Sequence, residues 1–182
     1  GSYSGHVRLY QWDGSSWNQL GSDIDGEASY DNSGYSVALS SDGSIVAIGA
    51  RSKDDNGSYS GHVRLYQWDG SSWNQLGNDI DGEDSVDYSG SSVALSSDGL
   101  IVAIGATGND GNGSDSGHVR LYEWDGSSWN QLGSDINGEG FDDYFGSSVA
   151  LSSNGSIVAI GANGNGSSLG YVHLYEWDGS SW

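Results

Sequence analysis

Acidic side chains recur at a fixed spacing along this chain and have the chemistry to bind a divalent cation. The pattern D-x-[DN]-G-E occurs three times, and a further aspartate follows each glutamate by four residues. Calcium takes about 6–8 oxygen ligands, and alternate residues of a loop turned by glycine can converge on one point. We therefore predict calcium binding in these loops. The candidate ligands are Asp23, Asp25, Glu27, Asp31, Asp79, Asp81, Glu83, Asp87, Asp135, Asn137, Glu139 and Asp143.

The same loops also have an interpretation that needs no metal. Carboxylates in turns commonly accept hydrogen bonds from nearby backbone N–H groups and remain solvated. Glycine does not stand where an EF-hand loop requires it. Both interpretations place the acidic loops on one rim of the molecule, and the sequence leaves the choice between them open.

Other reactive side chains repeat as well, whereas an enzyme needs only one catalytic constellation. His6, His62 and His118 occupy equivalent positions, which favours histidines packed at the start of a strand. The chain has no cysteine, and no G-x-S-x-G motif joins a strand to a helix. Adjacent carboxylates such as Asp54 and Asp55 are common in so acidic a chain. We therefore predict that the protein is not an enzyme.

Asparagines in N-x-[ST] sequences are candidate glycosylation sites. Asn56, Asn112 and Asn165 fall in the same loop of successive repeats, and Asn154 lies in a different turn. The recurrence favours N-glycosylation if the source is eukaryotic. Asn-Gly is also a common hairpin turn, so the motif has a purely structural interpretation too.

Composition restricts the partners. The 182 residues include 25 acidic and 5 basic side chains, for a net charge of −20, which repels nucleic acid phosphates and anionic lipid headgroups. Such a charge suits salt-rich or calcium-containing surroundings and favours a location outside the cell. No apolar run approaches the roughly 20 residues of a membrane helix, and without cysteine there is no disulfide framework.

The strongest feature of the sequence is internal repetition with a period of 56 residues. The motif G-H-V-R-L-Y begins at Gly5, Gly61 and Gly117, and a variant begins at Gly170. S-V-A-L-S-S and I-V-A-I-G-A recur at the same period. One supersecondary unit is therefore copied along the chain.

Each repeat predicts four short strands, from its β-branched and aromatic content and its turn residues. In one copy the strands are Ser36 to Ser40, Ile45 to Ala50, His62 to Trp68, and Trp73 to Ile80. The turn between the third and fourth strands is bracketed by tryptophans, which predicts a cross-strand aromatic pair. The chain has eight tryptophans and eleven tyrosines. They favour packing between sheets, with stacking against sugars as the alternative.

The third strand is apolar on both faces, so each four-stranded sheet must be covered on both sides by neighbouring copies. Radial stacking of such sheets gives a β-propeller, and a linear stack is the alternative. We predict an all-β fold of propeller blades in a single repeat array over residues 1–182. The blade units are residues 1–33, 34–89, 90–145 and 146–182.

Phe145-Gly146 followed by S-S-V-A-L-S, and then I-V-A-I-G-A at Ile157, resembles the FG-GAP repeat of integrin-α-type propellers. The resemblance implies a propeller used in extracellular adhesion or assembly. In that family calcium often occupies the loop between the first two strands. Here that loop is only Ser41-Asp42-Gly43 or its equivalents, too short and too poor in carboxylates, so the family's calcium loop does not carry over.

From these features we predict a non-enzymatic scaffold, extracellular or on the cell surface, for adhesion or structural assembly. The alternative is a multivalent glycan-binding propeller. Three blades and part of a fourth are too few for a closed ring, since propellers have at least about four blades. We therefore expect partners among further blades or other copies of the same protein, together with extracellular proteins or glycans. We expect neither nucleic acid binding nor membrane insertion.

Overall fold

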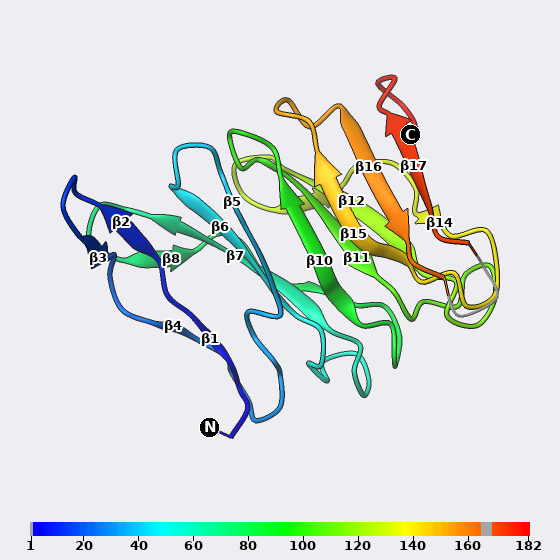
Figure 1. The fold of residues 1–182 in the computed structure, drawn as a ribbon, viewed down its shortest axis with the longest axis horizontal. Helices are drawn as coiled ribbons and strands as arrows, with labels where there is room; N and C mark the ends of the chain where they lie inside the picture. Colours follow the sequence, from blue (N-terminus) through cyan, green and yellow to red (C-terminus); the bar gives the residue numbers. More distant parts are fainter. Residues whose placement is uncertain (1, 165–168) are drawn as a thin grey trace.

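The computed structural model describes residues 2–164 and 169–182, and within them the chain forms strands and turns but no helix (Figure 1). The strands are β1 (His6–Val7), β2 (Tyr10–Trp12), β3 (Trp17–Gln19), β4 (Ile24–Asp25), β5 (Ser36–Leu39), β6 (Ile45–Ala50), β7 (His62–Trp68), β8 (Trp73–Gln75), β9 (Ile80–Asp81), β10 (Ser89–Leu95), β11 (Ile101–Ala106), β12 (His118–Trp124), β13 (Trp129–Gln131), β14 (Ile136–Asn137), β15 (Phe145–Leu151), β16 (Ile157–Ala162) and β17 (Tyr171–Glu176).

These strands form successive antiparallel sheets of one design. The order β5-β6-β7-β8, with β9 also paired to β7, repeats as β10-β11-β12-β13 with β14 paired to β12. The last sheet is β15-β16-β17, and two short ribbons, β1-β4 and β2-β3, precede the first full sheet. Figure 1 shows the sheets side by side, with the two chain termini at opposite ends. The predicted fold class, propeller-like blades in tandem, is confirmed.

The predicted second and third strands match β6 and β7 residue for residue, and the predicted first strand matches β5 to within one residue. In the next two repeats the first strand starts earlier than expected, at Ser89 and Phe145, and contains a bulge before Ser92 and Ser148. The bulge coincides with a glycine in the left-handed region, at φ 84° for Gly90.

The prediction of one continuous fourth strand is wrong. It is broken into β8 and β9, which both pair with β7. Gly77 lies in the break at φ 78°, and a Cβ there would come 2.6 Å from Cζ3 of Trp124 in the next repeat. The chain turns out of the ladder at this glycine, and the neighbouring tryptophan occupies the space.

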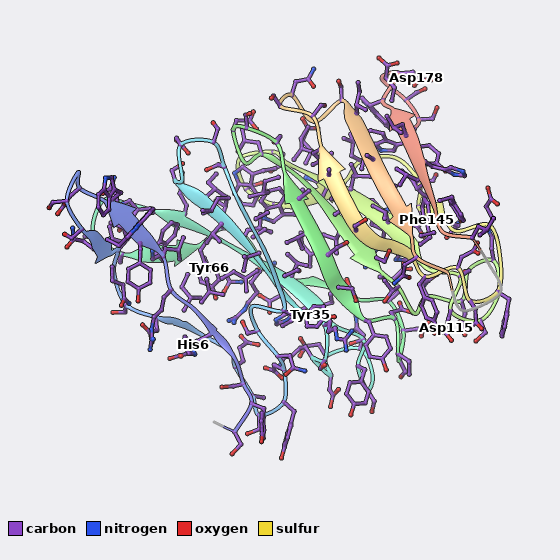
Figure 2. The ribbon with its side chains drawn as sticks, viewed as in Figure 1. His6, Tyr35, Tyr66, Asp115, Phe145 and Asp178 are labelled. Carbon is purple, nitrogen blue, oxygen red and sulfur yellow. The ribbon has the colours of Figure 1, made fainter. Side chains whose placement is uncertain are left out.

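The apolar core lies between the sheets. On one face of β7, Val63 and Leu65 are fully buried in a cluster with Ile104 of the following sheet. On the other face, Tyr66 packs in a cluster with Leu9 of the preceding repeat. Side chains fill the space between successive sheets in the same way along the array (Figure 2). Each full sheet is therefore covered on both faces by its neighbours, as its two apolar faces predict.

Glycines let the second strand of one sheet approach the first strand of the next sheet. A Cβ on Gly49 would lie 2.3 Å from the carbonyl oxygen of Gly90 in the next repeat, and a Cβ on Gly105 would lie 2.2 Å from that of Gly146. Ser36 Oγ donates to the same Gly90 oxygen at 2.7 Å. Only glycine permits this backbone contact, which fixes the distance between sheets.

Tryptophans tie the outer edges of the sheets together. Trp68 and Trp73 face each other across the β7–β8 turn with ring centroids 5.3 Å apart, so the predicted pair is confirmed. In the last three such pairs along the chain, the second indole also donates to a carbonyl of the preceding repeat. These hydrogen bonds run from Trp73 to Leu20, from Trp129 to Leu76 and from Trp182 to Leu132, at 2.8–3.0 Å.

The glycine contact predicts a difference between equivalent alanine variants. Gly105→Ala forces a methyl group against the Gly146 carbonyl, whereas the equivalent Gly161 meets only atoms of Ser148. Overpacking typically costs about 1–3 kcal/mol, so we expect Gly105→Ala to lower the free energy of unfolding by about that much more than Gly161→Ala. Urea denaturation of the two variants measures the difference. Equal losses would contradict the close approach.

Candidate functional site

Acidic side chains of two successive repeats meet at each junction between sheets. At the second junction Glu83 follows β9, His118 begins β12 and Asp135 precedes β14. The pairing of β12 with β14 aligns His118 with Asn137, which brings Asp135 beside the imidazole. Nδ1 of His118 lies 4.0 Å from Glu83 Oε2 and 4.0 Å from Asp135 Oδ2. This mixed set of nitrogen and carboxylate ligands has the spacing to hold a metal ion.

The first junction repeats the arrangement with one further carboxylate. Glu27, Asp55, His62 and Asp79 form a cluster whose ligand atoms all lie within 4.8 Å of one another. His62 Nδ1 is 3.2 Å from Asp55 Oδ2 and 3.4 Å from Asp79 Oδ2.

This first junction already contains a cation. The ammonium of Lys53 lies 3.4 Å from Glu27, 3.4 Å from Asp55 and 3.9 Å from Asp31. Burial lowers the pKa of Lys53, but the surrounding carboxylates, Asp31 foremost, outweigh it, and the pKa is raised. The lysine therefore stays charged and neutralises part of the cluster.

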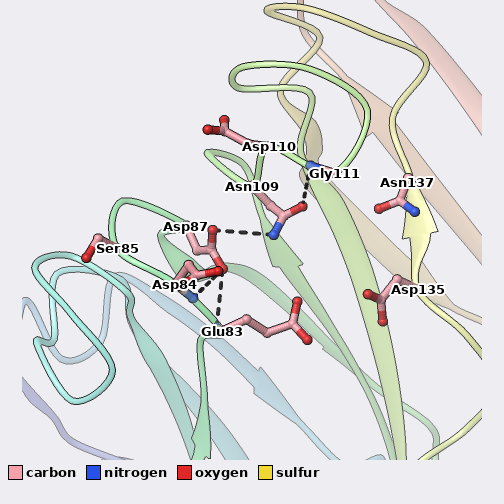
Figure 3. A pocket seen from close by; sticks show the side chains of 9 residues that line it. All are labelled: Glu83, Asp84, Ser85, Asp87, Asn109, Asp110, Gly111, Asp135 and Asn137. Atoms are coloured by element: carbon pink, nitrogen blue, oxygen red, sulfur yellow. Dashed lines mark hydrogen bonds between the residues drawn. The ribbon is translucent and has the colours of Figure 1, made fainter.

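The second junction has Asn109 where the first has Lys53, one period of 56 residues later. A pocket of about 610 Å³ opens here. Figure 3 shows Glu83 and Asp135 turned toward each other across it. The pocket is lined by Glu83, Asp84, Ser85, Asp87, Asn109, Asp110, Gly111, Asp135 and Asn137.

The titration behaviour of the second junction reflects buried negative charge. Burial and the neighbouring carboxylates, Asp135 first among them, raise the pKa of Glu83, although Arg120 opposes the shift. Burial and the charge of Arg120 lower the pKa of His118 to about 4, despite the attraction of Asp135. At neutral pH the imidazole is therefore uncharged and keeps a lone pair.

The structure does not gather the four acidic residues of each predicted loop into one cluster. The first aspartate of the loop serves one junction and the glutamate serves the next, as Asp79 and Glu83 show. Asp23 instead pairs with Arg8 at 2.8 Å. Asp25 offers its backbone carbonyl to Arg64, and Asp81 offers its carbonyl to Arg120.

The last aspartate of each loop is buried and accepts a hydrogen bond from a backbone N–H three residues earlier, as the metal-free interpretation of the loops describes. The donors are Ala28 to Asp31, Asp84 to Asp87 and Gly140 to Asp143, at 2.7–3.0 Å. Asn137 lines the pocket at the second junction, and Oε1 of Glu139 lies 3.5 Å from Nε2 of His173. The buried histidines and Asp55 were not among the predicted ligands, although the shared period of the histidines with the acidic loops could have pointed to them.

The turns between the first two strands do not fit the calcium that the family resemblance implies. Oδ1 of Asp42 accepts hydrogen bonds from Ser40 and Ser44, and Oδ1 of Asp98 accepts them from Ser96 and Leu100. These hydrogen bonds lower the pKa of both carboxyl groups. The carboxylates stabilise their own turns.

Two of the predicted glycosylation sites tie loops together. Nδ2 of Asn56 donates to Gly82 O, and Nδ2 of Asn112 donates to Gly138 O, each at 2.8 Å. Asn154 accepts hydrogen bonds within its own turn. Asn165 lies outside the described residues. The nitrogen that would carry a glycan is thus used structurally at Asn56 and Asn112.

Comparison with known proteins identifies the repeat. Residues 22–66 and 79–122 each match the family model of the FG-GAP repeat. No curated protein matches the chain. In the part of the chain that the structure describes, no helix is long and apolar enough to cross a membrane.

The Lys53 contacts predict a charge-dependent contribution to stability. Lys53→Met should lower the free energy of unfolding at pH 7 by about 1 kcal/mol, between the values for exposed and buried ion pairs, while Lys53→Arg should retain most of it. The pKa of Lys53 is higher in the folded state than its unfolded value of 10.5. The contribution of Lys53 to the free energy of unfolding is therefore complete below pH 10.5 and is lost as the pH rises through the folded-state pKa. Urea denaturation across this range measures it, and a methionine variant as stable as wild type would refute the role.

Proposed function

Since the chain is an FG-GAP-like repeat protein, we propose that it is a non-enzymatic scaffold that acts outside the cell, in adhesion or in a structural assembly. FG-GAP repeats are typical of extracellular proteins, and the net charge of −20 suits surroundings rich in counterions. The observation that carries the proposal concerns one apolar face of the repeated sheet. This face is buried in the inner sheets of the array but exposed on the last sheet.

This open face belongs to the β15-β16-β17 sheet. Val172 and Leu174 are 62% and 70% exposed, whereas the equivalent Val63 and Leu65 are fully buried against the next sheet. At the other end of the array, Tyr10 and Trp12 are about half exposed, although their equivalents in β7 face a preceding repeat.

The two ends therefore present the two halves of the internal junction. Head-to-tail contact between copies would repeat the interface that the chain already uses between its own repeats, and such heterologous contacts build rings or filaments. We propose that further blades of this type, from the same protein or from another copy of it, cover the open face.

Two other expectations from the sequence, calcium binding and glycosylation, remain proposals. Calcium binding remains a prediction, since the junctions supply carboxylates but also place a histidine among them, which calcium does not select. Glycosylation remains a prediction at Asn154 and would compete with structural hydrogen bonds at Asn56 and Asn112.

A single charge on the open face tests the assembly. We expect the wild-type protein to sediment as a species larger than its 19.0 kDa chain and Leu174→Glu to shift it toward the monomer, because a carboxylate would be buried without a partner. Leu169→Glu, at a residue 94% exposed before β17, is the matched control and should not shift it. A wild-type monomer, or equal behaviour of both variants, would contradict the proposal.

Glycan binding is the alternative, and one pocket favours it. A cavity of about 440 Å³ lies among the ends of several first and second strands and contains Tyr35, Tyr88 and Tyr144. The guanidinium of Arg51 sits 4.2 Å from the Tyr35 ring centroid. Aromatic faces beside an arginine and several hydroxyl groups are suited to sugars.

If this pocket binds glycans, Arg51→Ala should weaken binding on a glycan array by about tenfold, the loss of one charged hydrogen bond. Arg8→Ala removes the same charge at the distant Asp23 pair and should leave binding unchanged. Binding that both variants preserve would place the sugar elsewhere, and a wild-type protein that binds no glycan would remove the alternative.

A further inference from the structure

We propose that the second junction binds a divalent transition-metal ion, of the zinc type, through His118, Glu83 and Asp135. The three residues come from two successive repeats. Glu83 and Asp135 line the pocket in Figure 3, and Nδ1 of His118 lies 4.0 Å from a carboxylate oxygen of each. The ion would join one repeat to the next at the position where the first junction has the Lys53 ammonium.

The comparison between the two junctions is the first support. Both place a glutamate, a histidine and an aspartate within ligand distance, and both pair the glutamate with an arginine, at 3.4 Å for Arg64 and 3.3 Å for Arg120. Lys53 compensates the first cluster, but its equivalent Asn109 has a neutral side chain, whose amide donates to Asp87. The second cluster thus keeps the glutamate, the histidine and one aspartate, but it has Gly111 in place of Asp55 and lacks the internal cation.

The second support is the imidazole itself. His118 is 1% exposed, and its Nε2 has no hydrogen-bond partner among the described residues. Its Nδ1 faces the carboxylates of Glu83 and Asp135 at 4.0 Å, beyond hydrogen-bond distance. Burying a polar group without a partner is costly. An ion between the three groups would bind Nδ1, the nitrogen of this buried imidazole that faces Glu83 and Asp135.

The spacing of the carboxylate oxygens suits an inserted ion. Glu83 Oε1 is taken by Arg120, while Oε2 is directed at the histidine. Asp135 Oδ1 accepts a hydrogen bond from Gln131 at 2.7 Å, which orients the other oxygen, Oδ2, toward the pocket. Such outer contacts commonly orient metal-binding carboxylates.

The ligand types select the metal. Calcium and magnesium prefer oxygen ligands alone, whereas a neutral imidazole with carboxylates suits zinc and other transition metals. Three protein ligands leave a coordination position for water, for which the pocket has room. The Nδ1 ligand comes from the rigid start of β12, so the site is anchored on a strand of the scaffold.

Zinc titration of three proteins tests the assignment. After treatment with a chelator and its removal, calorimetry should show about one Zn²⁺ bound per wild-type chain. Asn109→Lys installs the cation of the first junction and should abolish binding. Lys53→Asn removes that cation from Glu27, Asp55, His62 and Asp79 and should raise the stoichiometry to about two. Circular dichroism checks that each variant is folded.

Histidine variants separate the two junctions. His118→Gln should weaken zinc binding by at least about tenfold, the loss of one ligand, whereas His62→Gln should leave it unchanged because Lys53 occupies that cluster. If either buried variant fails to fold, Asn109→Lys decides alone. Absence of zinc binding by the wild type, zinc binding that survives Asn109→Lys, or calcium bound as tightly as zinc would overturn the proposal.

Discussion

The distance between neighbouring sheets is set where two glycine backbones meet. Gly105 and Gly146 approach so closely that no side chain fits between them, and Gly49 and Gly90 do the same one repeat earlier. At this distance the apolar faces of β7 and β12 interlock with the sheets on either side. The hydrophobic core exists only because the sheets are stacked, so a single repeat has no core of its own. The loops that form the acidic junctions are brought together by the same spacing.

Much of this architecture could be predicted from the sequence, because it depends on local pattern. Period-two alternation and turn residues define β6 and β7, and the repeat shows that a neighbour must cover each face. The break between β8 and β9 could not be predicted in this way, since Gly77 makes room for Trp124, a residue of the next repeat. The sequence around the break gives no sign of that contact.

The candidate site shows the same limit. Acidic residues that are close in sequence, such as Asp79 and Glu83, lie in one predicted loop, so the sequence predicts one site for them. Stacking sends them to opposite junctions, and it adds a histidine from a strand that the sequence marks only as a packing element. Ligand sets that span two repeats depend on the register between sheets, which no local spacing encodes. The sequence locates the acidic residues, but their grouping into clusters required the fold.

The glycine contacts and the tryptophan hydrogen bonds recur from repeat to repeat, but the side chains at the junctions differ. The first holds Lys53 among carboxylates, the second holds a pocket beside His118, and the third packs Phe145 against Tyr171 with ring centroids 6.0 Å apart. The repeated frame of glycine contacts and tryptophan hydrogen bonds tolerates each of these substitutions. One scaffold can therefore accommodate an ion pair, a metal ligand set or an aromatic stack at equivalent positions.

The most direct test of the stacked frame is the exchange rate of the tryptophan indole protons, followed by NMR in deuterated water. The indole N–H groups of Trp73 and Trp129 donate across the junctions. The indoles of Trp68 and Trp124 donate no hydrogen bond among the described residues, although the backbone N–H groups of these two residues donate to Ser44 and Leu100. The account predicts slow exchange for the first two and fast exchange for their partners in the same turns, and equal rates within each pair would contradict it.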